Sequence, residues 1–239
     1  VSGWVRGVND AGLAVGWAYL KLGGRSDGGN NLLIDEIHQP RQTLPLRMAP
    51  LVLLATVVSH LFGASVGREG TAVQMGGALA DQLARVFKLA REERPVLLMC
   101  GIAAGFGSVF GTPLAGAVFA IEFLGVLRPT WTLVPALVAA IVGDATCRAI
   151  GVDHTPFPAV APLPITAAVL LRWAVFAVAV GVVAGAFVEL TRAIQRAGHG
   201  YARGVRMGVG GAVVVAVWAA IGGDAYLGLG VPTILAAFS

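Results

Sequence analysis

Long apolar runs, broken by glycine, proline and short charged stretches, make up most of this chain. Five of these runs lie at 46–66, 96–124, 130–147, 163–188 and 205–222. Each is long enough, or nearly long enough, to cross a bilayer core, which needs about 20 apolar residues in a helix. The pattern therefore predicts an all-α integral membrane protein that passes the bilayer several times.

The polar and glycine-rich breaks predict where individual helices begin and end. The residues "GGRSDGGNN" predict a loop that needs positive φ, followed by a short helix that is N-capped by Asn30 or Asn31 and runs to His38. A second glycine-rich break is expected at 63–70, and a helix then starts between Glu69 and Thr71 and reaches about Phe87. The other helices are expected over roughly 46–62, 130–150, 163–197 and 203–222, and over 95–124 with a break at 111–113; a last break lies at 227–232.

Many of these helices are too short or too interrupted to span a bilayer alone, so broken and re-entrant helices are expected. Irregular backbone at membrane depth survives only where protein buries it or where it lines a water-filled cavity. Two glycine-rich breaks, each followed by a helix start, therefore point to an internal site.

The composition supports a membrane protein and excludes several other classes. Charged residues make up 13% of the chain, about half the usual share for a soluble domain, and the mean hydropathy is +0.79. Basic residues gather at 85–94 and 192–206, so the positive-inside rule predicts that both loops are cytoplasmic. No alternation of basic and aromatic residues indicates nucleic-acid binding.

No enzyme, metal or cofactor site is predicted. The two cysteines and four histidines are scattered without ligand spacing, and no nucleophile stands beside a candidate base. Glycine pairs four residues apart are expected to let helices pack closely, at Gly12/Gly16, Gly101/Gly105, Gly107/Gly111 and Gly181/Gly185. Because the chain begins with Val1 and stops within a pattern, we expect residues 1–239 to be one truncated transmembrane domain.

The stretch "GASVGREGTAVQMGG" (63–77) places a glutamate between two glycines at a predicted helix start. The first four N–H groups of a helix have no intrahelical acceptor, and the helix dipole adds positive potential there. A buried helix start is therefore an anion site that needs no full positive charge. Two such starts, "GGNNLL" and "GREGTAVQ", can together surround one small anion.

Glu69 is the candidate gate, because its carboxylate can compete with an anion for the same N–H groups and leave them when protonated. Such a residue would couple anion movement to proton movement. The alternative is a plain helix cap that pairs with Arg68, which would not need glycine-rich flanks. For Asn30 and Asn31, the residues alone leave open an ordinary N-cap or an amide donor to the anion.

The remaining acidic residues receive structural interpretations. Asp35 and Glu36 are expected to suit the helix dipole as capping residues, Glu122 to lie at the end of an apolar helix, and Asp144 and Glu189 to lie near segment ends.

Two longer motifs resemble the CLC family of chloride channels and transporters. "GREGTAVQMGG" is similar to its helix-start motif G-(K/R)-E-G-P-x-V-Q, and "GIAAGFGSVFGTPLAGAVFAIE" (101–122) to its next stretch, G-x-A-A-G-x-x-x-x-F-x-x-P-L-A-G-x-x-F-x-I-E. The resemblance runs from about residue 12 to the end and covers the first part of a domain with two inverted halves. It implies a CLC-type helix bundle with an incomplete inverted repeat, forming a homodimer in the bacterial inner membrane.

Departures from the chloride-handling pattern resemble the fluoride-exporting branch of that family. "GNNLL" replaces G-S-G-I-P, which puts Asn30 at the serine of the anion site, and Thr71 replaces the motif's proline. The resemblance implies fluoride/proton antiport, with Glu69 as the gating glutamate. The anion path would be lined by Asn30 and by backbone N–H groups near Gly29, Asn31, Arg68 and Gly70.

One departure concerns the proton route. Phe123 stands where many chloride/proton exchangers carry an inner glutamate, with Glu122 just before it, so that route must differ or be absent. The alternatives are a chloride or other halide exchanger, a passive anion channel, and a truncated, inactive membrane protein with a packing or partner role.

Overall fold

The computed structural model describes residues 15, 18–61, 66–122, 130–154, 158, 164–223 and 230–238. Within these residues the chain is helical and contains no strand, as the apolar pattern predicted. The helices run, in chain order, over Tyr19–Gly23 (η1, a π-helix), Gly24–Gly28 (η2, a 3₁₀ helix), Gly29–His38 (α2), Met48–Leu61 (α3), Glu69–Val86 (α4), Arg94–Phe110 (α5), Pro113–Glu122 (α6), Thr130–Thr132 (η3), Leu133–Ala149 (α7), Ala167–Gly198 (α8), Arg203–Ile221 (α9) and Val231–Ala236 (α10).

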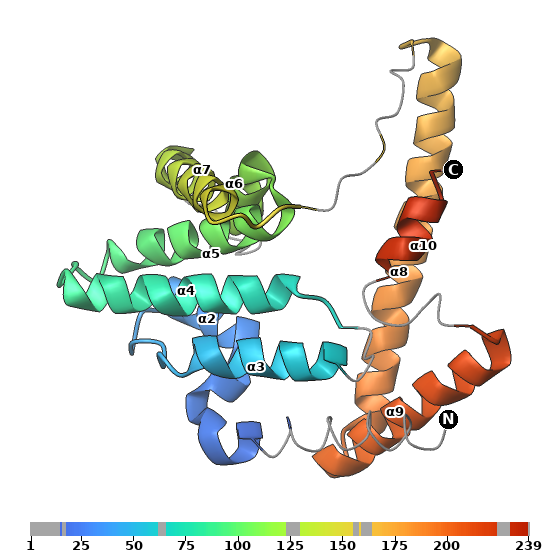
Figure 1. Cartoon of the computed structure of the whole chain (residues 1–239), viewed down its shortest axis with the longest axis horizontal. Helices are drawn as coiled ribbons and strands as arrows, with labels where there is room; N and C mark the ends of the chain where they lie inside the picture. Colours follow the sequence, from blue (N-terminus) through green and yellow to red (C-terminus); the bar gives the residue numbers. More distant parts are fainter. Residues whose placement is uncertain are drawn as a thin grey trace.

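Helices α4 and α5 lie at the centre of a bundle, with α3 against α4 and with α6 and α7 against α5 (Figure 1). Helix α8 extends away from this bundle and has no buried residue among those described. Of the described helices, α8 alone is long and apolar enough to cross a bilayer. Several predicted spanning stretches are shorter as helices, with 14 residues in α3 and 17 in α5.

Helices α4 and α5 pack closely because glycines face each other where they meet. A Cβ atom on Gly76 would overlap the carbonyl of Gly101, one on Gly101 would overlap the carbonyl of Gly76, and one on Gly105 would overlap the carbonyl of Ala72. The packing role predicted for Gly101 and Gly105 is therefore confirmed.

The same prediction is wrong for Gly181 and Gly185 within the described part of the chain. A Cβ atom on either residue would meet nothing within 4 Å, because α8 is exposed along its length. Gly12 and Gly16 lie outside the described residues.

Helix α2 lies parallel to α4, so their N-terminal ends lie at the same end of the pair. The side chain of Asn30 contacts Gln74, and three residues later Leu33 packs against Gly77. Contacts thus advance in the same direction along both helices. The Gly77 contact requires glycine, because an added Cβ would lie 2.6 Å from Leu33 Cδ2.

Ion pairs join the opposite ends of α2 and α4. Arg94, at the start of α5, binds Asp81 Oδ1 through Nε at 2.5 Å and Glu36 Oε2 through Nη1 at 3.2 Å. Arg25 binds Glu36 Oε1 at 2.5 Å. We call Arg25, Glu36, Asp81 and Arg94 the charge clamp; both of its carboxylates are almost fully buried.

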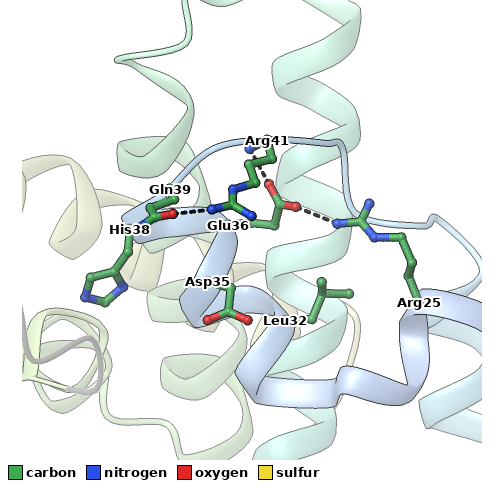
Figure 2. Close-up of a pocket in the computed structure, with 7 residues that line it drawn as sticks. All are labelled: Arg25, Leu32, Asp35, Glu36, His38, Gln39 and Arg41. Atoms are coloured by element: carbon green, nitrogen blue, oxygen red, sulfur yellow. Dashed lines mark hydrogen bonds and ion pairs between the residues drawn. The ribbon is translucent and has the colours of Figure 1, made fainter.

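The clamp corrects the interpretation of Asp35 and Glu36 as capping residues. Helix α2 begins at Gly29, so both acids lie in its last turn, where Asp35 is exposed and Glu36 is buried. Glu36 also accepts the N–H groups of Arg41 and Gln42, at 2.8 and 3.0 Å, from the loop that follows the helix. Figure 2 shows the Glu36 carboxylate between this loop and Arg25.

The surroundings of Glu36 set its protonation. Burial alone raises the pKa of its carboxyl, but the N–H groups of Arg41 and Gln42 and the guanidinium groups of Arg25 and Arg94 outweigh burial and lower that pKa. A carboxyl whose pKa is lowered by folding stabilises the fold above its unfolded pKa of about 4.3. This stabilisation is lost as the pH falls through the folded pKa.

Replacing Gly105 by alanine should destabilise the fold, whereas replacing Gly181 by alanine should not. Overpacking costs about 1–3 kcal/mol, while glycine to alanine in an open helix gains up to about 1 kcal/mol from helix propensity. Thermal unfolding of the full-length protein in detergent measures both changes. A lower melting temperature for both variants, or for neither, would contradict the packing described here.

Glu36→Gln should destabilise the protein by about 1–3 kcal/mol at neutral pH, because the half-buried guanidinium of Arg94 and the exposed guanidinium of Arg25 lose a charged partner. It should also remove part of the loss of stability in acid, since glutamine does not titrate. Thermal unfolding over a pH series compares it with wild type and with Glu189→Gln, whose exposed partner is Arg192. Parallel pH profiles for wild type and Glu36→Gln would show that Glu36 does not titrate with folding.

Candidate anion site

The starts of α2 and α4 carry no side-chain cap in the described structure. The N-cap residue is Gly28 for α2 and Arg68 for α4, and neither side chain accepts a helix N–H. The prediction that Asn30 or Asn31 caps α2 is therefore wrong: the helix begins at Gly29, so Asn30 is its second residue. Uncapped N–H groups at a helix start are available to an anion.

The turn before α2 depends on glycine, as the sequence predicted. Gly24 and Gly29 have φ of +52° and +54°, a region that other residues rarely adopt. The N–H of Gly29 donates to the Ser26 carbonyl within this turn. The N–H of Gly29 is therefore not free to bind an anion. Gly29 instead leaves room for Gln74, because an added Cβ would lie 3.4 Å from Gln74 Nε2.

The Asn30 side chain connects the two helix starts. Its Oδ1 accepts a hydrogen bond of 3.1 Å from Gln74 Nε2, and its Nδ2 lies 3.6 Å from the position that a Cβ of Gly70 would occupy. The oxygen is thereby fixed on Gln74, and the amide donors lie beside the start of α4. Asn31 and Arg68 have exposed side chains, so their possible contribution is limited to the backbone.

Glu69 is the first residue of α4, within the range from Glu69 to Thr71 that the glycine pattern predicted. Its half-buried side chain turns back over Gly67, where Oε2 fills the space that a Cβ would need. The first backbone hydrogen bond of the helix runs from Ala72 N to Arg68 O at 3.1 Å. The carboxylate thus lies just ahead of the N–H groups that precede this bond.

Two contributors to the site were missed from the sequence. Gln74 orients Asn30, and Gly67 makes room for the Glu69 carboxylate. Both residues belong to the motif around Glu69, but their roles depend on contacts that sequence spacing does not reveal. Thr71, already noted in place of the motif's proline, has an N–H in the first turn of α4 that a proline would lack, and its buried hydroxyl contacts Thr56 Oγ1 at 2.5 Å.

The other acids singled out earlier do not reach the helix starts. Glu122 is exposed at the end of α6, and Phe123 lies outside the described residues. Asp144 is buried in α7 and pairs with Arg148 at 3.0 Å. Glu189 lies inside α8 rather than near its end, and is exposed.

The chain is similar to two curated relatives and to one solved structure. The chain is 52% identical over 242 residues to the chloride/fluoride channel protein of Pseudomonas syringae pv. tomato, covering 95% of this chain and 52% of that protein. It is 38% identical over 84 residues to the H(+)/Cl(-) exchange transporter ClcA of Vibrio cholerae, covering 35% of this chain and 17% of ClcA. The crystal structure of a CLC-type fluoride/proton antiporter matches with a TM-score of 0.89 and 30% identity, over 99% of this chain and 60% of the other.

The chain thus spans about half the length of the Pseudomonas relative. The match to the solved antiporter covers nearly the whole of this chain. The family model described as voltage gated chloride channel matches residues 11–239. This match includes both helix starts, the charge clamp and helices α5 to α10. The chain belongs to the voltage gated chloride channel, or CLC, family.

Proposed function

We propose that this chain carries fluoride out of a bacterial cell in exchange for protons, as a homodimer in the inner membrane. The names of its relatives support the substrates: one is a chloride/fluoride channel protein and another a fluoride/proton antiporter. The proposal depends on one observation above all, that two parallel, uncapped helix starts meet at Asn30 and Gly70.

This arrangement attracts an anion without binding it too tightly to release. The Arg68 side chain is exposed, so the attraction comes from N–H groups and from two helix dipoles that point the same way. Partial charges of this kind favour an anion by less than a buried guanidinium would. Transport requires such moderate binding, because an ion must leave the site as well as enter it.

Glu69 gives the site its coupling to protons. When ionised, its carboxylate competes with fluoride for the N–H groups at the start of α4. When protonated, it loses its charge and yields that position to the anion. Protonation of Glu69 thereby admits the anion and its ionisation excludes the anion, so that proton and fluoride exchange places at the start of α4.

Asn30 supplies the selectivity in this proposal. Fluoride is small and strongly hydrated, so a site must replace its water with close donors. With its oxygen held by Gln74, the Asn30 amide can present two N–H donors, where a serine would present one hydroxyl.

A passive anion channel is the second candidate, because the Pseudomonas relative is named a channel. The same helix starts would then bind the anion, and Glu69 would open the path without carrying protons across. The two candidates differ in whether proton uptake accompanies fluoride efflux.

Glu69→Gln should abolish fluoride-driven proton uptake, because an amide does not take up the proton. The measurement follows fluoride efflux and proton uptake together, in liposomes that hold the full-length protein. Glu189→Gln, an exposed glutamate on α8, is the control and should behave as wild type. Proton uptake that persists in Glu69→Gln would reject this residue as the gate, and fluoride efflux without proton uptake in wild type would favour the channel.

Asn30→Ser should weaken fluoride binding by about tenfold to a hundredfold, since hydrogen bonds to charged groups contribute about 1.5–3 kcal/mol. Gln74→Leu should weaken fluoride binding less, by about fivefold, because it removes the hydrogen bond from Gln74 Nε2 that orients the Asn30 amide. Titration calorimetry with fluoride and with chloride measures both variants.

Gln82→Leu is the matched control for Gln74→Leu. Gln82 lies on the same helix, but its Nε2 donates to Leu44 O near the charge clamp. This variant should lower thermal stability and leave the preference for fluoride over chloride unchanged. Equal preference in wild type and Asn30→Ser would show that Asn30 does not set selectivity.

A further inference from the structure

His60, in the last turn of α3, presents a buried basic nitrogen that the transport site described so far does not use. Its Nδ1 lies 2.8 Å from the carbonyl oxygen of Thr56. A carbonyl only accepts hydrogen bonds, so Nδ1 carries the hydrogen and the neutral ring has its lone pair at Nε2. Nε2 is buried and has no hydrogen-bond partner among the described residues.

The packing of α3 on α4 fixes the height of His60 relative to the gate. Leu44, just before α3, binds Asp81 of α4, and Thr56 contacts Thr71 of α4, so the two helices run antiparallel. Thr56 Oγ1 donates to Val52 O at 2.8 Å, so the Thr71 hydroxyl is the donor in the Thr56–Thr71 contact. This contact sets the register of the two helices.

From that contact, His60 and Glu69 lie in the same direction along the bundle. His60 is four residues beyond Thr56, which is about 6 Å along α3. Glu69 is two residues before Thr71, about 3 Å in the same direction along α4, and its carboxylate reaches further back over Gly67. The last turn of α3, which carries His60, and the start of α4, which carries Glu69, therefore lie at the same level along the bundle.

Few other titratable groups lie on the elements that pack against α3. On α4, Asp81 and Arg85 are at the far end, and Arg68 and Glu69 are at the near end. Helix η1 carries Tyr19 and Lys21. In these described elements, Glu69 is therefore the carboxylate at the same end as His60.

We propose that His60 is a second proton-binding group of the transport path, exchanging a proton with Glu69. One intervening water passes the proton: the O–H bond of the Glu69 carboxyl breaks, the water takes that proton and gives up one of its own, and an N–H bond forms at His60 Nε2. The carboxylate regains its charge and the imidazole becomes imidazolium. The reverse transfer restores both groups, and no electrons are gained or lost. This inference rests on the proposed antiport, and it gives the released proton an acceptor inside the bundle.

The test uses the full-length protein in liposomes and measures proton uptake and fluoride efflux together. His60→Asn keeps an amide that can donate to the Thr56 carbonyl but removes the basic nitrogen. Proton uptake per fluoride should fall by at least about tenfold, in line with the loss of a positioned acid–base group, while fluoride binding measured by calorimetry stays unchanged. His38→Asn is the matched control, because His38 Nδ1 also lies 2.8 Å from the carbonyl four residues earlier, yet its side chain is exposed.

A second variant, His60→Ala, distinguishes loss of a proton carrier from loss of the fold. His60→Ala opens space for free imidazole, which should restore proton uptake if the ring acts as a proton carrier. Wild-type coupling in His60→Asn would overturn the inference alone. A parallel loss of both fluxes with a lower melting temperature and no rescue by imidazole would also overturn it, in favour of a structural role. Fluoride efflux without proton uptake in wild type would instead overturn the proposed antiport.

Discussion

The contact between the start of α2 and the start of α4 is the constraint on which the rest of this structure depends. Two helix dipoles that point their positive ends at one place repel each other, and their uncapped N–H groups need partners. The fold offsets this with the Asn30–Gln74 hydrogen bond at the site and with the charge clamp at the opposite ends of the helices. An anion, or the Glu69 carboxylate in its place, would satisfy the remaining N–H groups.

The glycines of α4 and α5 allow this contact to be held in place. Close approach at Gly76, Gly101 and Gly105 joins α4 firmly to α5, whose first residue, Arg94, belongs to the charge clamp. The clamp then holds α2 through Glu36. Close glycine packing between α4 and α5, together with the charge clamp, thus positions the site. The site itself contains no buried cationic side chain among the described residues.

Local signals in the sequence predicted much of the fold. The glycine-rich break predicted the start of α4 between Glu69 and Thr71, and the structure has it at Glu69. The predicted break at 111–113 separates α5 from α6, and Gly111 adopts a left-handed φ of +66° there. These features depend on residues that are neighbours in the chain. The error at α2 was also local: an asparagine can cap a helix, but the turn at Gly28 begins the helix before Asn30 is reached.

The parts that sequence reasoning missed depend on distant residues. Arg94 and Glu36 are 58 positions apart, and Asn30 and Gln74 are 44 apart, so no periodicity links them. From the sequence, Glu36 resembled a capping residue that suits the helix dipole, and only its distant partners show that it belongs to the charge clamp. Gly181 and Gly185 have the spacing of packing glycines, but the described chain places no helix against them.

The most direct test of the shared site is the pH dependence of fluoride affinity, measured by titration calorimetry on the full-length protein at equilibrium. If Glu69 and fluoride compete for the same N–H groups, wild-type affinity should fall as the pH rises, by up to about tenfold for each pH unit, because one proton is taken up with each fluoride bound. The dependence should disappear in Glu69→Ala. Affinity that does not change with pH in wild type would contradict the account, because the carboxylate and the anion would then occupy separate places.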